Sequence, residues 1–540
     1  MDEYNWSEAI DYFQNALTFA KGKDKAIVLA RLGRCHHVVG DLEKSLVNFR
    51  ESLEITKTIR DTIGHAANLG NMGLVYRSKG DLDQALEYLQ GALRIHKEIG
   101  LKEDQASDLG NIGLIYHDKG DLDQALKYHQ DALKIQKEIG YRQGEANQLG
   151  NIGNVHYLKG DLDQALKYHQ DALKIAKEIG YRQGEASDLG NIGLIYQSKG
   201  DLDQALKYHQ DALKIHKEIG FREGEASDLG NIGLIYKTKG DLDQALKYHQ
   251  DALNIDKEIG YREGEASDLG NIGLIYHDKG DLDQALKYHQ DALRIAKEIG
   301  SREGEANQLG NIGNIHYFKG DLDEALKYFE QVLVMERELG RKWGEANALG
   351  NIGLIHKTKG DLDQALKYHQ DALKIAKEIG YRQGEASDLG NIGLIYKAKG
   401  DLNQALKYHQ DALKIHKEIG YRQGEAKQLG NIGLVYQAKG DLDQALKYHQ
   451  DALKIQKEIG YRQGEANQLG NIGLIYISKG DLDQGLKHLQ EALRVFEEIR
   501  MQAEIQKTKK SIERISQQIK QMKNEKNDVM SKQEPDQTEA

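Results

Sequence analysis

Apolar residues recur three or four positions apart through most of the chain, which is the spacing of one face of an α-helix. In the representative segment 182–220, the pattern predicts a turn at 182–184, a first helix over 185–199 and a second helix over 202–219. The first helix carries its apolar face at Ala186, Leu189, Ile192, Gly193 and Tyr196. No segment alternates with a period of two, so no β-strand is expected.

The second helix of this segment has two apolar stripes. One comprises Leu202, Ala205, Leu206, His209, Ala212 and Leu213, and the other comprises Tyr208, Ile215 and Ile219. Two stripes require two neighbours, so we expect this helix to pack within its own pair and against an adjoining pair. Gly200 and Gly220 should end the two helices in the left-handed conformation. Asp201 should cap the second helix, with Gln204 completing a capping box.

The glycines indicate that this segment is one unit of a long array. They recur every 40 residues, in one series from Gly40 to Gly480 and in another from Gly100 to Gly460. Residues 21–500 therefore contain twelve units of 40 residues. A fixed period of this length is typical of a solenoid, in which stacked neighbours supply the core that one unit cannot build alone.

Two further glycines, Gly190 and Gly193, lie inside the expected first helix and recur in nearly every unit. Glycine within a helix costs about 1 kcal/mol relative to alanine. We therefore expect both positions to lie at a helix–helix approach too close for any side chain.

The spacing of Leu189, Gly193, Tyr196, Gly200 and Ala205, with Ala212, resembles the tetratricopeptide repeat signature over about residues 2–500. The 40-residue length is similar to the long-repeat subclass, which includes kinesin light chains, spindle-orientation adaptors and prokaryotic signalling arrays. The proline usual after the second helix is absent. The resemblance implies an all-α, right-handed α-solenoid of helix-turn-helix repeats, whose first helices line a concave groove.

The repeat boundaries divide the chain into four parts. We expect a half repeat of one helix at 1–21, twelve repeats over 22–500, a capping helix at 501–523 and a disordered tail at 524–540. A short coiled-coil seam is the alternative for 501–523. The unmatched apolar face of 1–21 favours an incomplete, fragment-like start over a surface for self-association.

A stripe of the first helix outside its apolar face carries an asparagine that recurs in each unit, and its amide suits the main chain of a peptide. The expected peptide-binding residues of this ladder are Asn111, Asn151, Asn191, Asn231, Asn271, Asn311, Asn351, Asn391 and Asn431. The alternative is that each asparagine bonds to the neighbouring repeat and serves only to hold the array together.

Two units, four repeats apart, depart together from the common pattern. One carries Asn154 and Tyr157, and the other carries Asn314, Tyr317 and Phe318. Aromatic side chains beside an amide are typical of binding anchors, so these residues are candidate hot spots on the groove. Repacking after sequence drift is the alternative explanation.

A second ladder places histidine in the second helix of most units. Its members are His129, His169, His209, His249, His289, His369, His409 and His449. Equivalent positions in adjacent repeats are too far apart to share a metal ion, so no metal site is expected. We expect these histidines to be mostly buried in place of an aromatic residue, and their protonation at pH 5–6 to loosen the array.

Composition narrows the function. The chain has 540 residues, and its one cysteine (Cys35) argues against a disulfide framework. Its net charge of −11 argues against nucleic-acid binding. No run of about 18 apolar residues indicates a membrane span. Nearly every acid, histidine and tyrosine occurs about a dozen times, whereas an active site needs unlike groups that converge once.

These observations predict a non-enzymatic, cytoplasmic scaffold without cofactors. It would bind extended or helical segments of protein partners in an asparagine-lined groove. A regulatory module for a separately encoded signalling enzyme or ATPase, and a self-assembling structural array, are the alternatives.

Overall fold

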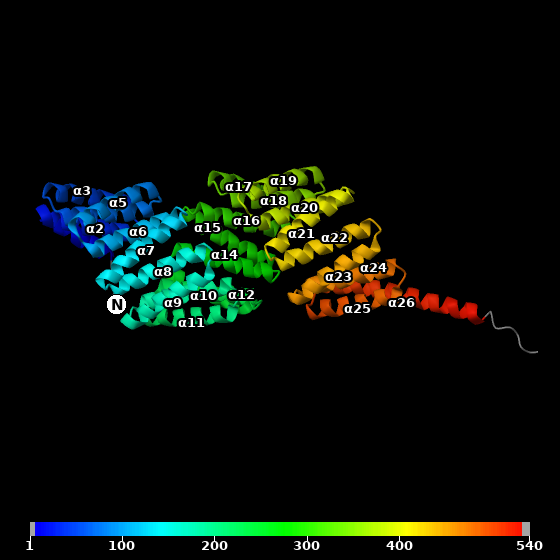
Figure 1. The fold of residues 1–540 in the computed structure, drawn as a ribbon. Helices are drawn as coiled ribbons and strands as arrows, with labels where there is room; N and C mark the ends of the chain where they lie inside the picture. The colour runs from blue at the N-terminus through cyan, green and yellow to red at the C-terminus, as the bar shows by residue number, and fades with distance from the viewer. Residues whose placement is uncertain (1–5, 532–540) are drawn as a thin grey trace, which may run out of the picture. The chain divides into compact units, whose positions relative to one another are not determined.

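The computed structural model describes residues 6–531, and within that range it contains 26 α-helices and no β-strand. The chain divides after Lys279 into two compact units. Consecutive helices pack against each other throughout each unit, as expected for a solenoid of helix pairs (Figure 1). None of the described helices is long and apolar enough to cross a membrane.

The first unit contains fourteen helices. These are α1 (Trp6–Leu17), α2 (Gly22–Val38), α3 (Leu42–Thr58), α4 (Thr62–Ser78), α5 (Leu82–Ile99), α6 (Lys102–Asp118), α7 (Leu122–Ile139), α8 (Arg142–Leu158), α9 (Leu162–Ile179), α10 (Arg182–Ser198), α11 (Leu202–Ile219), α12 (Arg222–Thr238), α13 (Leu242–Ile259) and α14 (Arg262–Asp278).

The second unit contains twelve helices. These are α15 (Leu282–Glu298), α16 (Arg302–Lys319), α17 (Leu322–Glu338), α18 (Lys342–Thr358), α19 (Leu362–Glu378), α20 (Arg382–Ala398), α21 (Leu402–Glu418), α22 (Arg422–Ala438), α23 (Leu442–Glu458), α24 (Arg462–Ser478), α25 (Leu482–Glu498) and α26 (Gln502–Ser531).

The turn between α10 and α11 has the geometry that the sequence predicts. Gly200 adopts a φ of +81° and Gly220 a φ of +71°, so both helices end in the left-handed conformation. The carboxylate of Asp201 accepts a hydrogen bond from the backbone N–H of Gln204 at 3.1 Å. The N–H of Asp201 donates to the carbonyl of Tyr196 at 2.9 Å, so this turn satisfies that donor without a capping box.

The start of α10 corrects the prediction of a turn at 182–184, because these residues form the first turn of the helix. The chain reverses two residues earlier, at Gly180, which has a φ of +69°. Arg182 then stabilises the first turn, since its guanidinium donates to Glu185 at 2.5 Å and to Glu218 of α11. An arginine is therefore a helix-starting residue in this array rather than part of a loop.

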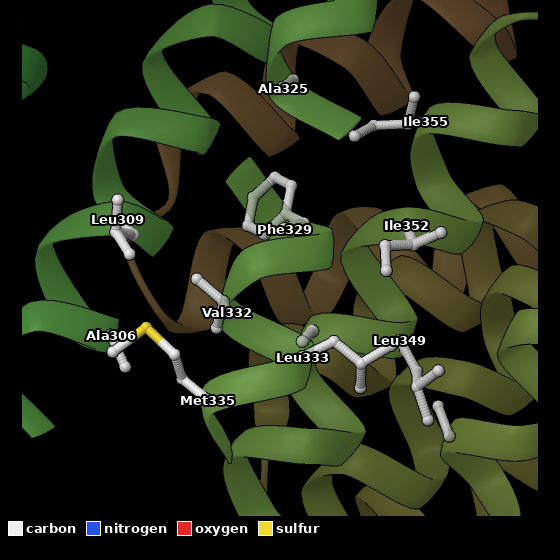
Figure 2. Close-up of a cluster of buried hydrophobic side chains, with 12 residues drawn as sticks. Ala306, Leu309, Ala325, Phe329, Val332, Leu333, Met335, Leu349, Ile352 and Ile355 are labelled. Atoms are coloured by element: carbon white, nitrogen blue, oxygen red, sulfur yellow. The ribbon is translucent and has the colours of Figure 1, made fainter. Parts of the chain in front are cut away.

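The second helices bury two stripes against two neighbours, as predicted. In the second unit, α17 places Phe329 and Val332 toward Leu309 of α16, and it places Leu333 toward Leu349 of α18 (Figure 2). In the first unit, the corresponding small cluster comprises Ala186, Leu189, Ala212 and Ile215, together with Leu173 and Tyr208. Since Leu173 lies in the preceding hairpin, the core continues from one hairpin to the next.

The two glycines within α10 differ in their surroundings. A methyl group added to Gly193 would lie 2.7 Å from the ring of His209, so the predicted close approach is confirmed at this position. At Gly190 the nearest atom to such a methyl group is an oxygen of Asp228 at 3.7 Å, an ordinary contact. The prediction for Gly190 is therefore wrong, because this residue faces a cavity rather than another helix.

The ends of the chain differ in part from the expected division. α1 occupies part of the expected half repeat 1–21, and residues 1–5 lie outside the described range. The expected capping helix, α26, buries Ile505 and Ile515, and Ile505 packs in a cluster with α25. It continues to Ser531, which corrects the expected start of disorder at 524, because no glycine or proline interrupts the helix-forming residues before Pro535. Residues 532–540 lie outside the described range.

Candidate functional site

The first helices of successive hairpins lie next to each other on one face of each unit. α8 packs against α10 and α12 against α14 in the first unit, and α18 packs against α20 in the second. The stripe formed by Ser187, Asn191, Leu194 and Ser198 of α10 is partly or fully exposed on this helix. This shared face is the candidate groove.

The asparagine ladder lies half-buried along this face in both units. Across the described residues, no hydrogen bond joins the side chain of any ladder asparagine to another protein group. The interpretation of the ladder as a link between repeats requires such bonds. The amide donors and the acceptor of Asn191 and its equivalents are therefore available to a ligand.

Cavities bring consecutive asparagines together. In the first unit, a cavity of about 590 Å³ is lined by Asn111, Asn151, Asn154 and Asn191. A second cavity, of about 330 Å³, joins Asn191 to Asn231, and a third, of about 320 Å³, joins Asn231 to Asn271. In the second unit, a cavity of about 220 Å³ joins Asn391 to Asn431. Asn311, Asn314 and Asn351 are half-buried at corresponding positions of α16 and α18 but line none of these cavities.

Each of these cavities also reaches a residue near the end of a second helix that sequence reasoning missed. These floor residues are Gln136, His216, Asp256 and His416. Each is buried and lines its cavity together with a buried residue of the next first helix: Gln148, Asp228, Asp268 and Gln428, respectively. The available signal was variation of this position between otherwise near-identical units.

The histidine ladder is buried, as predicted, and it belongs to the core beneath the groove. His169 donates from Nδ1 to Asp188 at 3.0 Å, whereas His409 donates to the amide oxygen of Gln428 at 2.9 Å. Burial lowers the pKa of His409 to about 4, and burial raises the pKa of Asp188 despite the histidine beside it. His409 is therefore neutral in the folded protein at pH 5–6.

The tyrosines proposed as hot spots form bonds between hairpins. The hydroxyl of Tyr157 lies 2.9 Å from that of Ser198, and the hydroxyl of Tyr317 lies 3.2 Å from that of Thr358. Both rings are half-buried, and neither lines the cavities above. Phe318 is 61% exposed and packs edge-on against Tyr317. These contacts give the tyrosines a structural role, and their role in binding stays a prediction.

The remaining chemically reactive groups do not assemble into a site. Cys35 is buried, and burial raises the pKa of its thiol. Trp343 lies in the first turn of α18 and packs near Tyr381 with the ring centroids 6.1 Å apart. Within residues 6–531, no three His, Cys, Asp or Glu side chains are arranged to hold a metal ion.

Solved structures with a similar fold share little sequence with this chain. The apo form of the quorum sensor NprR from B. thuringiensis is 16% identical, with a TM-score of 0.48, over 67% of this chain and 99% of that one. The apo form of RapI is 16% identical, with a TM-score of 0.42, over 51% and 99% of the two chains. BtubC from P. vanneervenii is 22% identical, with a TM-score of 0.35, over 40% and 89%.

No curated protein matches the sequence. The tetratricopeptide repeat family matches it seven times, at residues 64–138, 104–178, 145–218, 185–258, 264–338, 344–418 and 424–498. These matches cover most of the chain and coincide with the helix pairs described above. The chain therefore belongs to the tetratricopeptide repeat family.

Proposed function

We propose that this protein is a non-enzymatic scaffold that holds an extended segment of a partner protein along its first-helix groove. The observation that supports the proposal is the ladder of half-buried asparagines, whose amides make no hydrogen bond to the described part of the chain and line consecutive cavities. These amides are open to solvent, so the main chain of a ligand can replace water as their hydrogen-bonding partner. The single free cysteine, Cys35, suits a reducing, cytoplasmic setting.

The spacing of the ladder suits a peptide main chain. Packed helices lie about 8–10 Å apart, and an extended chain advances about 3.3 Å per residue. One asparagine would therefore meet about every third residue of the ligand. Since an amide can both donate to a carbonyl and accept from an N–H, the ladder would hold backbone while other groove residues distinguish side chains.

The test compares peptide binding by the wild-type chain with binding by a variant in which Asn191, Asn231 and Asn271 are changed to alanine. A library of blocked twelve-residue peptides identifies ligands, and titration calorimetry measures their affinity. We expect the triple variant to bind these ligands at least about tenfold more weakly, since each lost amide removes about 0.5–1.5 kcal/mol.

The control separates binding from stability. Asn254→Ala alters an exposed asparagine of α13 outside the ladder and should bind as the wild type does. The triple variant should melt at or above the wild-type temperature, because alanine favours a helix more than asparagine does. A lower melting temperature with unchanged affinity would show that the ladder links repeats instead.

A further inference from the structure

One cavity of the groove is distinguished by two buried aspartates on its floor. This acid cavity lies between α12, α13 and α14, has a volume of about 320 Å³ and joins Asn231 to Asn271. Asp256 and Asp268 form its buried floor, while Glu223 and Glu263 are exposed at its rim. The lining contains no lysine, arginine or histidine, although His249 of the core contacts Asp268 from outside the cavity.

The carboxyl group of Asp256 is buried without a matching donor. Asp256 is 3% exposed, and its Oδ1 has no hydrogen-bond partner among the described residues. Asp268 is better satisfied, because it accepts a hydrogen bond from Nδ1 of His249 at 2.9 Å. Burial, the neighbouring charge of Asp268 and a hydrogen bond with that carboxyl raise the pKa of Asp256 to about 7. A buried acid of this kind gains free energy from any ligand that brings a positive donor to it.

The neighbouring cavity shows how the same position is satisfied from within the chain. There His216 occupies the place of Asp256, and its Nδ1 donates to Asp228 at 2.8 Å. At the start of the unit, His96 donates to Asp108 at 2.7 Å in the same way. Replacement of this histidine by Asp256 removes the internal donor and adds a second acceptor. The acid cavity therefore lacks the internal donor that the cavity of His216 contains.

We propose that the acid cavity receives the side chain of an arginine from the extended segment, an inference that rests on the function proposed above. A guanidinium group offers five N–H donors in a planar fork and can bond to two carboxylates at once. The rim acids Glu223 and Glu263 attract a cation toward the opening. A metal ion suits the cavity less well, since no three ligating side chains are arranged around one point in the described chain.

The cavity between Asn391 and Asn431 gives an internal contrast. The same frame there carries His416 and Gln428 on its floor and Lys427 beside them, with no acidic residue in the lining. An arginine has no carboxylate to meet at that site. The pair of floor aspartates is thus the feature on which arginine recognition by the acid cavity depends.

The test uses the full chain and synthetic peptides that differ at one atom of one side chain. The first probe is a blocked twelve-residue peptide of alanine and serine with one central arginine, and the second has citrulline, the neutral isostere, in its place. We expect the wild type to bind the arginine peptide at least about tenfold more tightly. Binding should also release a proton near pH 6.5, which calorimetry in two buffers of different ionisation enthalpy detects.

Two variants keep the test independent of folding, because the chain itself contains both arrangements. Asp256→Ala copies the positions of Ala176 and Ala376, and Asp256→His copies the pair of His216 and Asp228. Both should retain the wild-type melting temperature or exceed it, and both should bind the two peptides equally. Adding His216→Asp to Asp256→His should restore the preference at the neighbouring cavity.

The outcomes separate the two proposals. Equal binding of both peptides by the wild type, or a preference that survives Asp256→Ala, overturns arginine recognition. Peptide binding that depends on the asparagine ladder but shows no preference for arginine would support the proposed groove and contradict arginine recognition. If the arginine preference depends on Asp256 while the triple asparagine variant binds normally, the inference stands and the proposed main-chain grip falls.

Discussion

At the scale of the single residue, the groove contains groups that reduce stability. Asp256 is buried beside Asp268 and faces Glu265 on α14 and Glu223 on α12. Since its pKa rises to about 7 from the ordinary 3.8, the folded protein holds a proton that the unfolded chain releases. The contribution of this carboxyl to the free energy of unfolding is therefore lowest at high pH, whereas the contribution of an ion-paired aspartate is highest there.

We expect Asp256→Ala to stabilise the protein by about 1–3 kcal/mol above pH 7. The gain should shrink as the pH falls from 7 toward 4 and vanish below that, where the carboxyl is protonated in both states. Urea unfolding of the wild type and the variant at pH 4.5, 6 and 7.5 measures the difference. A difference that does not change with pH would show that the carboxyl does not titrate in this range.

Gly190 and Gly193 should respond oppositely to alanine. Gly193→Ala places a methyl group against the buried ring of His209 and should cost about 1–3 kcal/mol. Gly190→Ala meets no close atom and should stabilise the protein by up to about 1 kcal/mol through helix propensity. The added methyl group should also narrow the cavity and weaken peptide binding. Hydrogen exchange of α10 and α11 reports the first effect locally, and calorimetry with a groove ligand reports the second.

At the scale of the element, each hairpin is joined to the next by polar contacts as well as by its apolar core. Residues 41 positions apart meet along the first helices, where Arg77 pairs with Asp118 at 2.6 Å and Tyr157 bonds to Ser198 at 2.9 Å. The positions of Tyr157 and Ser198, each of which differs from unit to unit, are therefore partners across the hairpin boundary. This explains part of their variation without reference to a ligand.

Tyr157→Phe separates the two roles of this residue. Removal of the hydroxyl should weaken the contact between α8 and α10 by about 0.5–1.5 kcal/mol and leave the ring in place. Hydrogen exchange of these two helices measures the loss. If Tyr157 is also a binding anchor, Tyr157→Ala should reduce peptide affinity well beyond Tyr157→Phe, whereas equal affinities would contradict the hot-spot hypothesis.

The elements were predictable from sequence to the extent that each unit contains its own signals. The glycine period, the aspartate caps and the apolar stripes act within 40 residues, so helix order and pairing follow from them directly. The helix starts were misplaced because Arg182 bonds to Glu218, a contact made only in the folded hairpin. The floor residues were missed for a similar reason, since the role of Asp256 depends on Asp268 in the following hairpin.

At the scale of the whole molecule, the buried histidines make stability depend on pH in many repeats at once. Burial lowers the pKa of His129, His409 and His449, and their partners are neutral glutamines. In hairpins where the partner is an acid, burial instead raises the carboxyl pKa, as at Asp188 and Asp388. As the pH falls, hairpins with a glutamine partner should lose stability, whereas hairpins with an acidic partner should gain it. A general effect of pH would change the stability of both kinds in the same direction.

The region around His409 should become less stable between pH 7.5 and 5.5. Its imidazole stays neutral in the folded chain, beside Gln428 and near Lys357, Lys397 and Lys427, while the unfolded chain takes up a proton below pH 6.5. Stability is thus complete above pH 6.5 and is lost as the pH falls toward 4, by about 1 kcal/mol at pH 5.5. Hydrogen exchange of α21 and α22, corrected for the intrinsic effect of pH, measures the loss.

His409→Phe provides the matched variant, because Phe329 occupies the same position in α17 and packs against Gly313. The variant should abolish the acid sensitivity of α21 and leave that of α23, which carries His449, unchanged. Equal exchange at pH 7.5 and 5.5 in the wild type would contradict the mechanism. Because His129 and His449 are also buried beside glutamines, the acid sensitivities of these hairpins should add, whereas the hairpins of Asp188 and Asp388 should not contribute to the loss.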